Sequence, residues 1–105
     1  MSRNHVELSA VIAEVKALRF TPAGLPALDL LIEHESSVEE AGAQRTVKAA
    51  VKAVAFGAMA ERLARQPLGT AWVFSGFLGT TRNAKGVALH IQAFEAIQTA
   101  ANPSD

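Results

Sequence analysis

The chain contains 105 residues, half of them hydrophobic, with ten basic and ten acidic side chains and no cysteine. This profile predicts one small globular domain, and it excludes a disulfide framework, a thiolate nucleophile and a thiolate zinc site. A chain of this length buries one core and leaves little room for a deep substrate cavity, so we expect a protein that is not an enzyme. Charged residues interrupt the first apolar segment, so we expect no signal peptide and no membrane span, and a cytoplasmic location.

The first segment, residues 5–19, alternates apolar and polar side chains but changes phase near Ala10. A slip of one residue moves the following side chains to the opposite face, so we expect a strand that is kinked or bulged at this point. Residues 21–26 are rich in proline and glycine and predict a turn. Period two then resumes in a second strand, whose inward residues should be Leu28, Leu30 and Ile32.

Four glutamates and no basic residue occupy positions 33–40, and residues 39–43 are expected to form a polar loop. We interpret the acidic segment as the solvated tip of a hairpin. A third strand follows, in which Lys48 and Lys52 lie on the outer face because valine and alanine alternate with them.

From Phe56 the period becomes helical, with Met59 and Leu63 on the same apolar side. Pro67 ends this helix, which we expect over residues 57–65.

Two further strands follow the helix. Trp72, Phe74 and Gly76 share one face of a fourth strand, so the Trp72 ring should point inward and report folding. A turn at residues 82–86 leads to a fifth strand, whose inward residues should be Val87, Leu89 and Ile91.

This order of elements predicts an all-β fold, a five-stranded OB-fold Greek-key barrel with one short helix between strands three and four. SH3-like barrels and small α+β domains give similar orders and stay open as alternatives. The domain should cover residues 1–100, with residues 101–105 as a short flexible tail.

Catalytic and metal-binding patterns are missing from the sequence. His5, His34 and His90 lie on different expected strands without the spacing that places two imidazoles on one metal. Ser75, His90 and Glu95 are the residue types of a catalytic triad. The sequence has no GxSxG elbow, however, so we expect no such triad. The glycines match no phosphate-binding pattern, so we expect no catalytic residue, no metal and no cofactor.

A nucleic-acid interface is the binding function that the expected fold favours. In an OB barrel the outer face of strands two and three and the loop between strands four and five border one groove, where cations can meet phosphates and exposed aromatic rings can stack on bases. The candidates are Arg19, Phe20, Arg45, Lys48, Lys52, Arg82 and Lys85. An ordinary solvated surface is the alternative for these residues. For the acidic segment, the functional alternative to a solvated hairpin tip is a contact for a basic protein partner or a device that keeps DNA away.

Six short runs of residues carry a more specific signal: Leu8–Ala10, Leu18–Pro26, Leu31–His34, Glu39–Gly42, Gly76–Phe77 and Leu89–His90. In this order, over residues 4–98, the chain resembles the bacterial primosomal replication protein N (PriB) family. The resemblance implies a homodimeric OB-fold related to single-stranded-DNA-binding protein. It also implies a role in replication restart, with binding to single-stranded DNA and the PriA helicase and handoff to DnaT.

Departures from the family pattern concern the ligand face. The family has aromatic residues where this chain has Ala43 and Lys48, and a basic residue where it has Glu35. We therefore expect weak binding of single-stranded DNA together with stimulation of PriA. The alternative is a dimeric OB-fold adaptor that hardly touches DNA. The family's basic positions are best matched by Arg19, Arg82 and Lys85.

Overall fold

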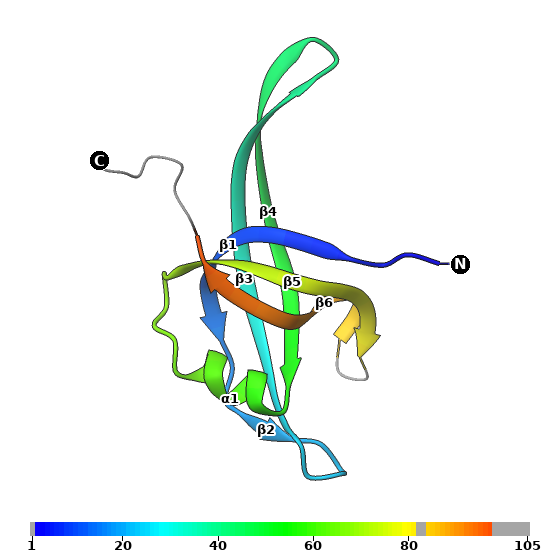
Figure 1. Cartoon of the computed structure of the whole chain (residues 1–105), viewed down its shortest axis with the longest axis vertical. Helices are drawn as coiled ribbons and strands as arrows, with labels where there is room; N and C mark the ends of the chain where they lie inside the picture. Colours follow the sequence, from blue (N-terminus) through cyan, green and yellow to red (C-terminus); the bar gives the residue numbers. More distant parts are fainter. Residues whose placement is uncertain (1, 82–83, 98–105) are drawn as a thin grey trace.

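The alternating segments of the sequence form long antiparallel strands, and the helical segment forms one short helix beside them (Figure 1). The computed structural model describes residues 2–81 and 84–97. In chain order the elements are β1 (Val6–Val15), β2 (Arg19–Phe20), β3 (Pro26–Glu40), β4 (Ala43–Phe56), α1 (Ala58–Ala64), β5 (Ala71–Thr81) and β6 (Ala84–Ala96). The expected order is confirmed, with the addition of the two-residue strand β2.

The five long strands close into a barrel, as expected for an OB-fold. The strand order is β1-β5-β6-β4-β3-β2, and an additional pairing of β1 with β3 closes the ring. All neighbouring strands are antiparallel except β4 and β6, which are parallel. The short helix α1 lies between β4 and β5 in the chain, near the end of the barrel where β2 lies (Figure 1).

Strand β1 belongs to two neighbours, which explains its irregular pattern. Its first half pairs with β5 up to Val11, and its second half pairs with β3 from the same residue onward. The pairing of β1 with β3 shifts register between Ile12 and Glu14. The irregularity therefore lies a few residues after the kink that was expected near Ala10. Ala10 and Ile12 are both buried, so the expected change of phase near Ala10 comes too early in the chain.

The core lies inside the barrel and follows the expected alternation on β3, where Leu28, Leu30 and Ile32 are buried. Helix α1 covers one end of the barrel with Ala60 and Leu63, both fully buried. The largest fully buried side chains are Phe74, Ile12, Leu28, Ile32, Leu63, Leu89 and Val54. These side chains come from strands that are far apart in sequence, so the core forms only when the barrel closes.

Trp72 faces the core, as expected, although its ring is only partly buried. The indole packs edge-on against Phe94, with the ring centroids 5.0 Å apart at an angle of 86°. Its Nε1–H donates a hydrogen bond to the Thr70 hydroxyl at 2.9 Å. An aromatic pair of this kind contributes about 0.5–1.5 kcal/mol beyond the area that it buries.

Two expected positions are wrong because the local backbone departs from regular geometry. Phe56 is the last residue of β4, paired with Ala27, and is not part of the helix. Gly57, at φ 69°, turns the chain between the strand and the helix. Val87 is 59% exposed, whereas Leu89 is buried. The register of β5 and β6 shifts near Gly79, so Val87 does not share the inward face with Leu89.

Strand β6 already begins at Ala84, inside the range that was expected to form a turn at residues 82–86. Arg82 lies outside the described residues, and so does the expected tail at 101–105. Helix α1, the one helix among the residues that the structure describes, is too short to cross a membrane.

The acidic segment is not a loop but the outer half of strand β3. Pairing with β4 continues to Glu40 and Ala43, so the turn consists of Ala41 and Gly42 alone. Both turn residues have positive φ, 54° and 80°, as two-residue hairpin turns of type I′ require. The two strands extend far beyond the barrel (Figure 1), and we call residues 33–50 the hairpin arm.

Candidate functional site

Three lysines converge on a groove at the side of the barrel. The groove has a volume of about 450 Å³ and is lined by Glu14, Lys16, Asp29, Leu30, Leu31, Lys52 and Lys85. We call it the lysine groove. Its walls come from the end of β1, the middle of β3 and β4, and the start of β6. Two of the expected interface residues, Lys52 and Lys85, thus lie in one place.

Each lysine reaches the groove for a local reason. Lys52 lies on the outer face of β4 because its neighbour Ala53 faces the core. Lys16 directly follows β1, and its backbone N–H donates to the Asp29 carbonyl oxygen at 2.9 Å. Lys85 is the second residue of β6. Sequence reasoning missed Lys16, because only the closing contact of β1 with β3 brings it beside Asp29.

Arg19 is held by a carboxylate instead of being free for a ligand. Its Nε–H donates to Asp29 Oδ2 at 2.7 Å, and its Nη2–H donates to Oδ1 at 3.2 Å. The hydrogen bond with Asp29 raises the pKa of Arg19 above its usual range, although desolvation acts in the opposite direction. This two-point contact ties β2 to β3 and offsets the negative charge of Asp29 at the edge of the lysine groove.

Phe20 is the exposed aromatic that the sequence predicted, with 64% of its surface accessible. It lies on β2, paired with Pro26, and is not among the residues that line the lysine groove. Neither groove described here is lined by a phenylalanine or a tryptophan. Base stacking therefore has few platforms near the clustered cations.

The basic residues of the hairpin arm do not share one face. Arg45 lies on the opposite side of β4 from Lys48 and Lys52, because side chains alternate along a strand. Its Nε is 3.0 Å from the Glu40 carboxylate, and both side chains are exposed. Lys48 stands directly opposite Glu35 on β3. The grouping of all three bases on one outer surface is therefore wrong for Arg45.

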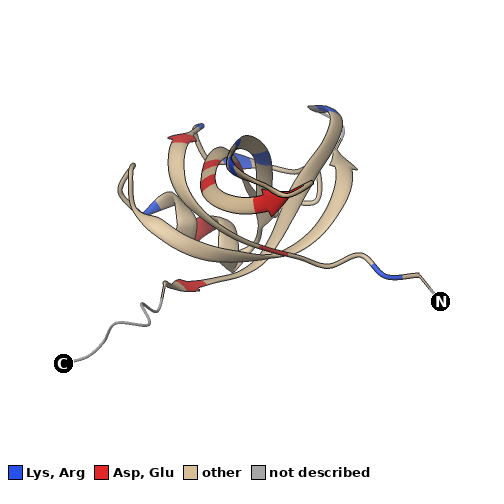
Figure 2. Ribbon diagram, turned by 90° about the horizontal axis from the view of Figure 1, so that it is seen from above, with Lys and Arg blue, Asp and Glu red and all other residues tan. Residues whose placement is uncertain are grey.

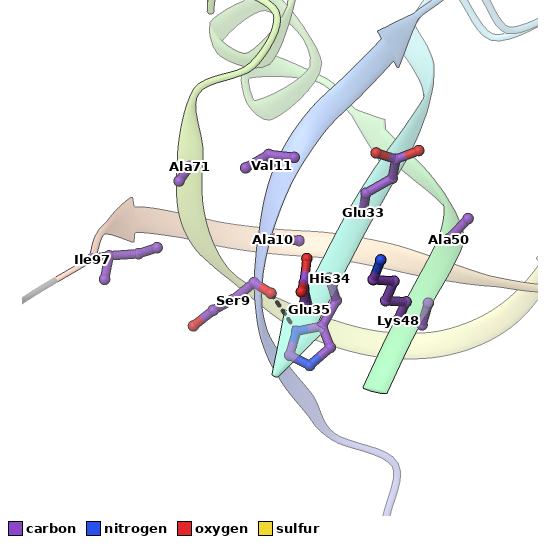
Figure 3. Close-up of a pocket in the computed structure, with 11 residues that line it drawn as sticks. Ser9, Ala10, Val11, Glu33, His34, Glu35, Lys48, Ala50, Ala71 and Ile97 are labelled. Atoms are coloured by element: carbon purple, nitrogen blue, oxygen red, sulfur yellow. Dashed lines mark hydrogen bonds between the residues drawn. The ribbon is translucent and has the colours of Figure 1, made fainter. Parts of the chain in front are cut away.

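A second groove of about 580 Å³ lies where the arm leaves the barrel. Ser9, Glu33, Glu35 and Lys48 line it together with His34 (Figure 3). His34 Nδ1 donates to the Ser9 carbonyl oxygen at 2.6 Å, and its Nε2 is 2.8 Å from the Ser36 hydroxyl. The contact with Ser9 joins β1 to β3, and the contact with Ser36 lies within β3, so both indicate a structural role for His34.

His90 has no catalytic neighbours on β6. Its ring stacks on Phe77 with centroids 4.7 Å apart, and its buried Nε2 has no hydrogen-bond partner. The hypothetical triad of Ser75, His90 and Glu95 is therefore not assembled, because no hydrogen bond in the described part of the chain links these three residues. In residues 2–81 and 84–97, no group of three or more His, Asp or Glu side chains could hold a metal ion.

Comparisons with known proteins agree with this fold. A family model described as another single-strand binding protein family matches residues 4–93. The replication restart protein PriB of Bordetella pertussis is 51% identical over 90 residues, which are 85% of this chain and 84% of that protein. PriB of Neisseria meningitidis serogroup B is 34% identical over 93 residues, 89% of this chain and 75% of that protein.

Solved structures give the same result. PriB from Ralstonia solanacearum superimposes with a TM-score of 0.83 at 32% identity, covering 92% of this chain and 100% of that one. The single-stranded DNA binding protein of Thermus aquaticus has a TM-score of 0.71 at 22% identity, covering 93% of this chain and 52% of that one, a likeness of fold alone.

Proposed function

This chain belongs to the PriB family of replication restart proteins, and we propose that it binds single-stranded DNA in the lysine groove as an accessory protein of the restart primosome. In this role it supports the PriA helicase and does not itself catalyse a reaction. A cytoplasmic location follows from that role.

The convergence of Lys16, Lys52 and Lys85 is the observation that carries the proposal. The three lysines and the neighbouring Arg19 carry four positive charges, and Glu14 and Asp29 carry two negative charges. This region therefore has a net charge of about plus two in a chain whose total charge is zero. Lysines bind phosphates as point charges and release the counterions of the nucleic acid.

Binding of this kind is weak and tolerant of sequence, because the groove offers charge without stacking platforms. Each stacked base contributes about 1–3 kcal/mol in aromatic-rich relatives of this fold. The positions Ala43 and Lys48, which are aromatic in the better-known family members, supply no such platform here. Phe20 and Arg82 remain proposed contacts at the edges of the site.

The protein partners of the proposal follow from the family. We propose a homodimer that contacts PriA and hands the complex to DnaT. The alternative function is a dimeric adaptor that stimulates PriA through protein contacts and barely touches DNA. The acidic, exposed hairpin arm favours this alternative, because four acids and two bases give it a net charge of minus two.

Titration of fluorescein-labelled oligo-dT, followed by anisotropy, tests the DNA-binding function. Lys52→Gln and Lys85→Gln should each weaken binding and each reduce the slope of log K against log salt by about 0.7, the value for one phosphate contact on a single strand. Arg65→Gln is the matched control, since Arg65 is an exposed base outside the groove lining. It should leave the slope unchanged.

Helicase assays with PriA separate the two functions. If the lysine variants lose DNA binding and lose stimulation of PriA together, DNA binding in the groove underlies the activity. If they bind DNA as the parent does, the groove is not the site. Full stimulation by variants that no longer bind oligo-dT would establish the adaptor function instead.

A further inference from the structure

We propose that the acidic strand of the hairpin arm competes with DNA phosphates for Arg45 and Lys48 and so confines the nucleic acid to the lysine groove. This inference rests on the proposed binding of single-stranded DNA. It assigns a role to Glu35 and Glu40, two carboxylates that determine the length of the DNA footprint. Figure 2, a view along the arm, shows acidic and basic segments of its two strands beside each other.

The pairing register places each base of the arm next to an acid. Glu35 and Lys48 are direct partners across β3 and β4, on the same face of the arm (Figure 3). Side chains opposite each other in an antiparallel pair have Cβ atoms about 4.5–5.5 Å apart, and opposite charges there attract. Glu33, two residues before Glu35, lies on the same face, so Lys48 has two carboxylates near it.

Arg45 is occupied on the other face. Its Nε lies 3.0 Å from Glu40 Oε1, a separation at which a carboxylate takes the place that a phosphate oxygen would need. A phosphate that approaches either base must therefore displace a carboxylate or accept its repulsion. In the lysine groove Arg19 neutralises Asp29, so the three lysines share one remaining lining carboxylate, Glu14.

The two pairs have little value for folding, which makes them suitable for substitution. Both members of the Arg45–Glu40 pair are about two-thirds exposed, and exposed ion pairs contribute little to stability. Glu35 and Lys48 are exposed as well. Neutral variants should therefore fold like the parent protein and change only the electrostatics of the arm.

The test compares the affinity of the full chain for long and short oligo-dT before and after the substitutions Glu35→Gln and Glu40→Gln. Each freed base adds one phosphate contact, which strengthens binding about 5-fold at ~0.1 M salt and steepens the salt slope by about 0.7. The double variant should therefore bind the long strand about 25-fold more tightly, with a slope steeper by about 1.4. The short strand, which fills the lysine groove alone, should gain little.

Two matched variants control for total charge and for the identity of the freed base. Glu39→Gln removes a carboxylate from the same arm, but Glu39 stands opposite Gln44 and not opposite a base. It should therefore give a much smaller gain. Adding Lys48→Gln to the Glu35→Gln variant should remove the gain, because the contact requires the lysine.

The outcomes separate this inference from the proposed function. A gain with Glu35→Gln that Lys48→Gln removes supports competition within the arm. An equal gain with Glu39→Gln, or no gain while Lys52→Gln still weakens binding, overturns the competition and leaves the groove as the site. A parent chain that does not bind, with a double variant that does, refutes DNA binding by the native protein and supports the competition. Absence of binding in both refutes both.

Discussion

Trp72 offers the clearest test of the packing inside the barrel, because it is the one tryptophan of the chain. Full truncation of a large core aromatic to alanine costs about 3–5 kcal/mol. The Trp72 ring is partly exposed but packs edge-on against Phe94 and donates its N–H to Thr70. We therefore expect Trp72→Ala to lower the free energy of unfolding by about 3 kcal/mol, the lower end of that range.

Urea unfolding followed by far-ultraviolet circular dichroism measures this loss, with all variants at one protein concentration because association would stabilise the folded state. With a slope of about 1.5 kcal/mol per molar urea, the midpoint should fall by about 2 M. Leu68→Ala is the control, because Leu68 is 63% exposed. Its stability should change by less than about 0.5 kcal/mol.

Trp72→Phe separates the two contacts of the indole. It keeps an aromatic ring against Phe94 but removes the N–H donor and part of the indole's volume, so it should cost roughly 1–2 kcal/mol, less than the alanine variant. Oligo-dT should leave the Trp72 emission of the parent protein unchanged, because Trp72 lines neither groove. A loss below about 1 kcal/mol for Trp72→Ala, or strong quenching by oligo-dT, would refute the assignment of this ring to the core.

Three further substitutions test the backbone. Gly76→Ala should destabilise the barrel by roughly 2–4 kcal/mol in a thermal melt, since the added Cβ would overlap the carbonyl oxygen of His90 on β6; an unchanged melting temperature would contradict that close approach. Ala41→Asn should stabilise the hairpin by about 0.5–1 kcal/mol, because asparagine tolerates the positive φ of this turn better than alanine; a loss of stability would refute the turn geometry. Asn4→Ala should speed exchange of the Leu78 amide about 5-fold, because the Asn4 side chain accepts from that N–H and donates to the Leu78 carbonyl; unchanged exchange would show that the contact is not formed in solution.

Period-two alternation was sufficient to predict the strands that build the core. The inward residues Leu28, Leu30 and Ile32 are buried as expected, and the helix of residues 58–64 lies within the expected range. Alternation reports only which face is buried, however. It could not show that residues 33–40 continue as a strand, since most of these side chains are exposed and no buried face marks the alternation.

The proposed binding residues were harder to predict because their grouping depends on contacts between distant segments. Lys52 and Lys85 were expected on one groove, and the barrel brings them together. Lys16 gave no signal, since only barrel closure places the end of β1 against β3. The pairing of Arg19 with Asp29 depends on the register of the short hairpin from β2 to β3, which composition does not specify.

A net charge of zero determines how such a protein can attract DNA. Long-range steering scales with the total field, so a neutral chain gains little from it. Attraction must act within the Debye length, about 8 Å at physiological salt. It is therefore confined to the neighbourhood of the lysine groove. The salt dependence of binding should therefore follow Lys16, Lys52 and Lys85 and not the total charge. For the same reason, neutralising Glu39 changes the total charge as much as neutralising Glu35 does. Only the Glu35 substitution is expected to free a cation for phosphate contact, because Lys48 stands opposite Glu35.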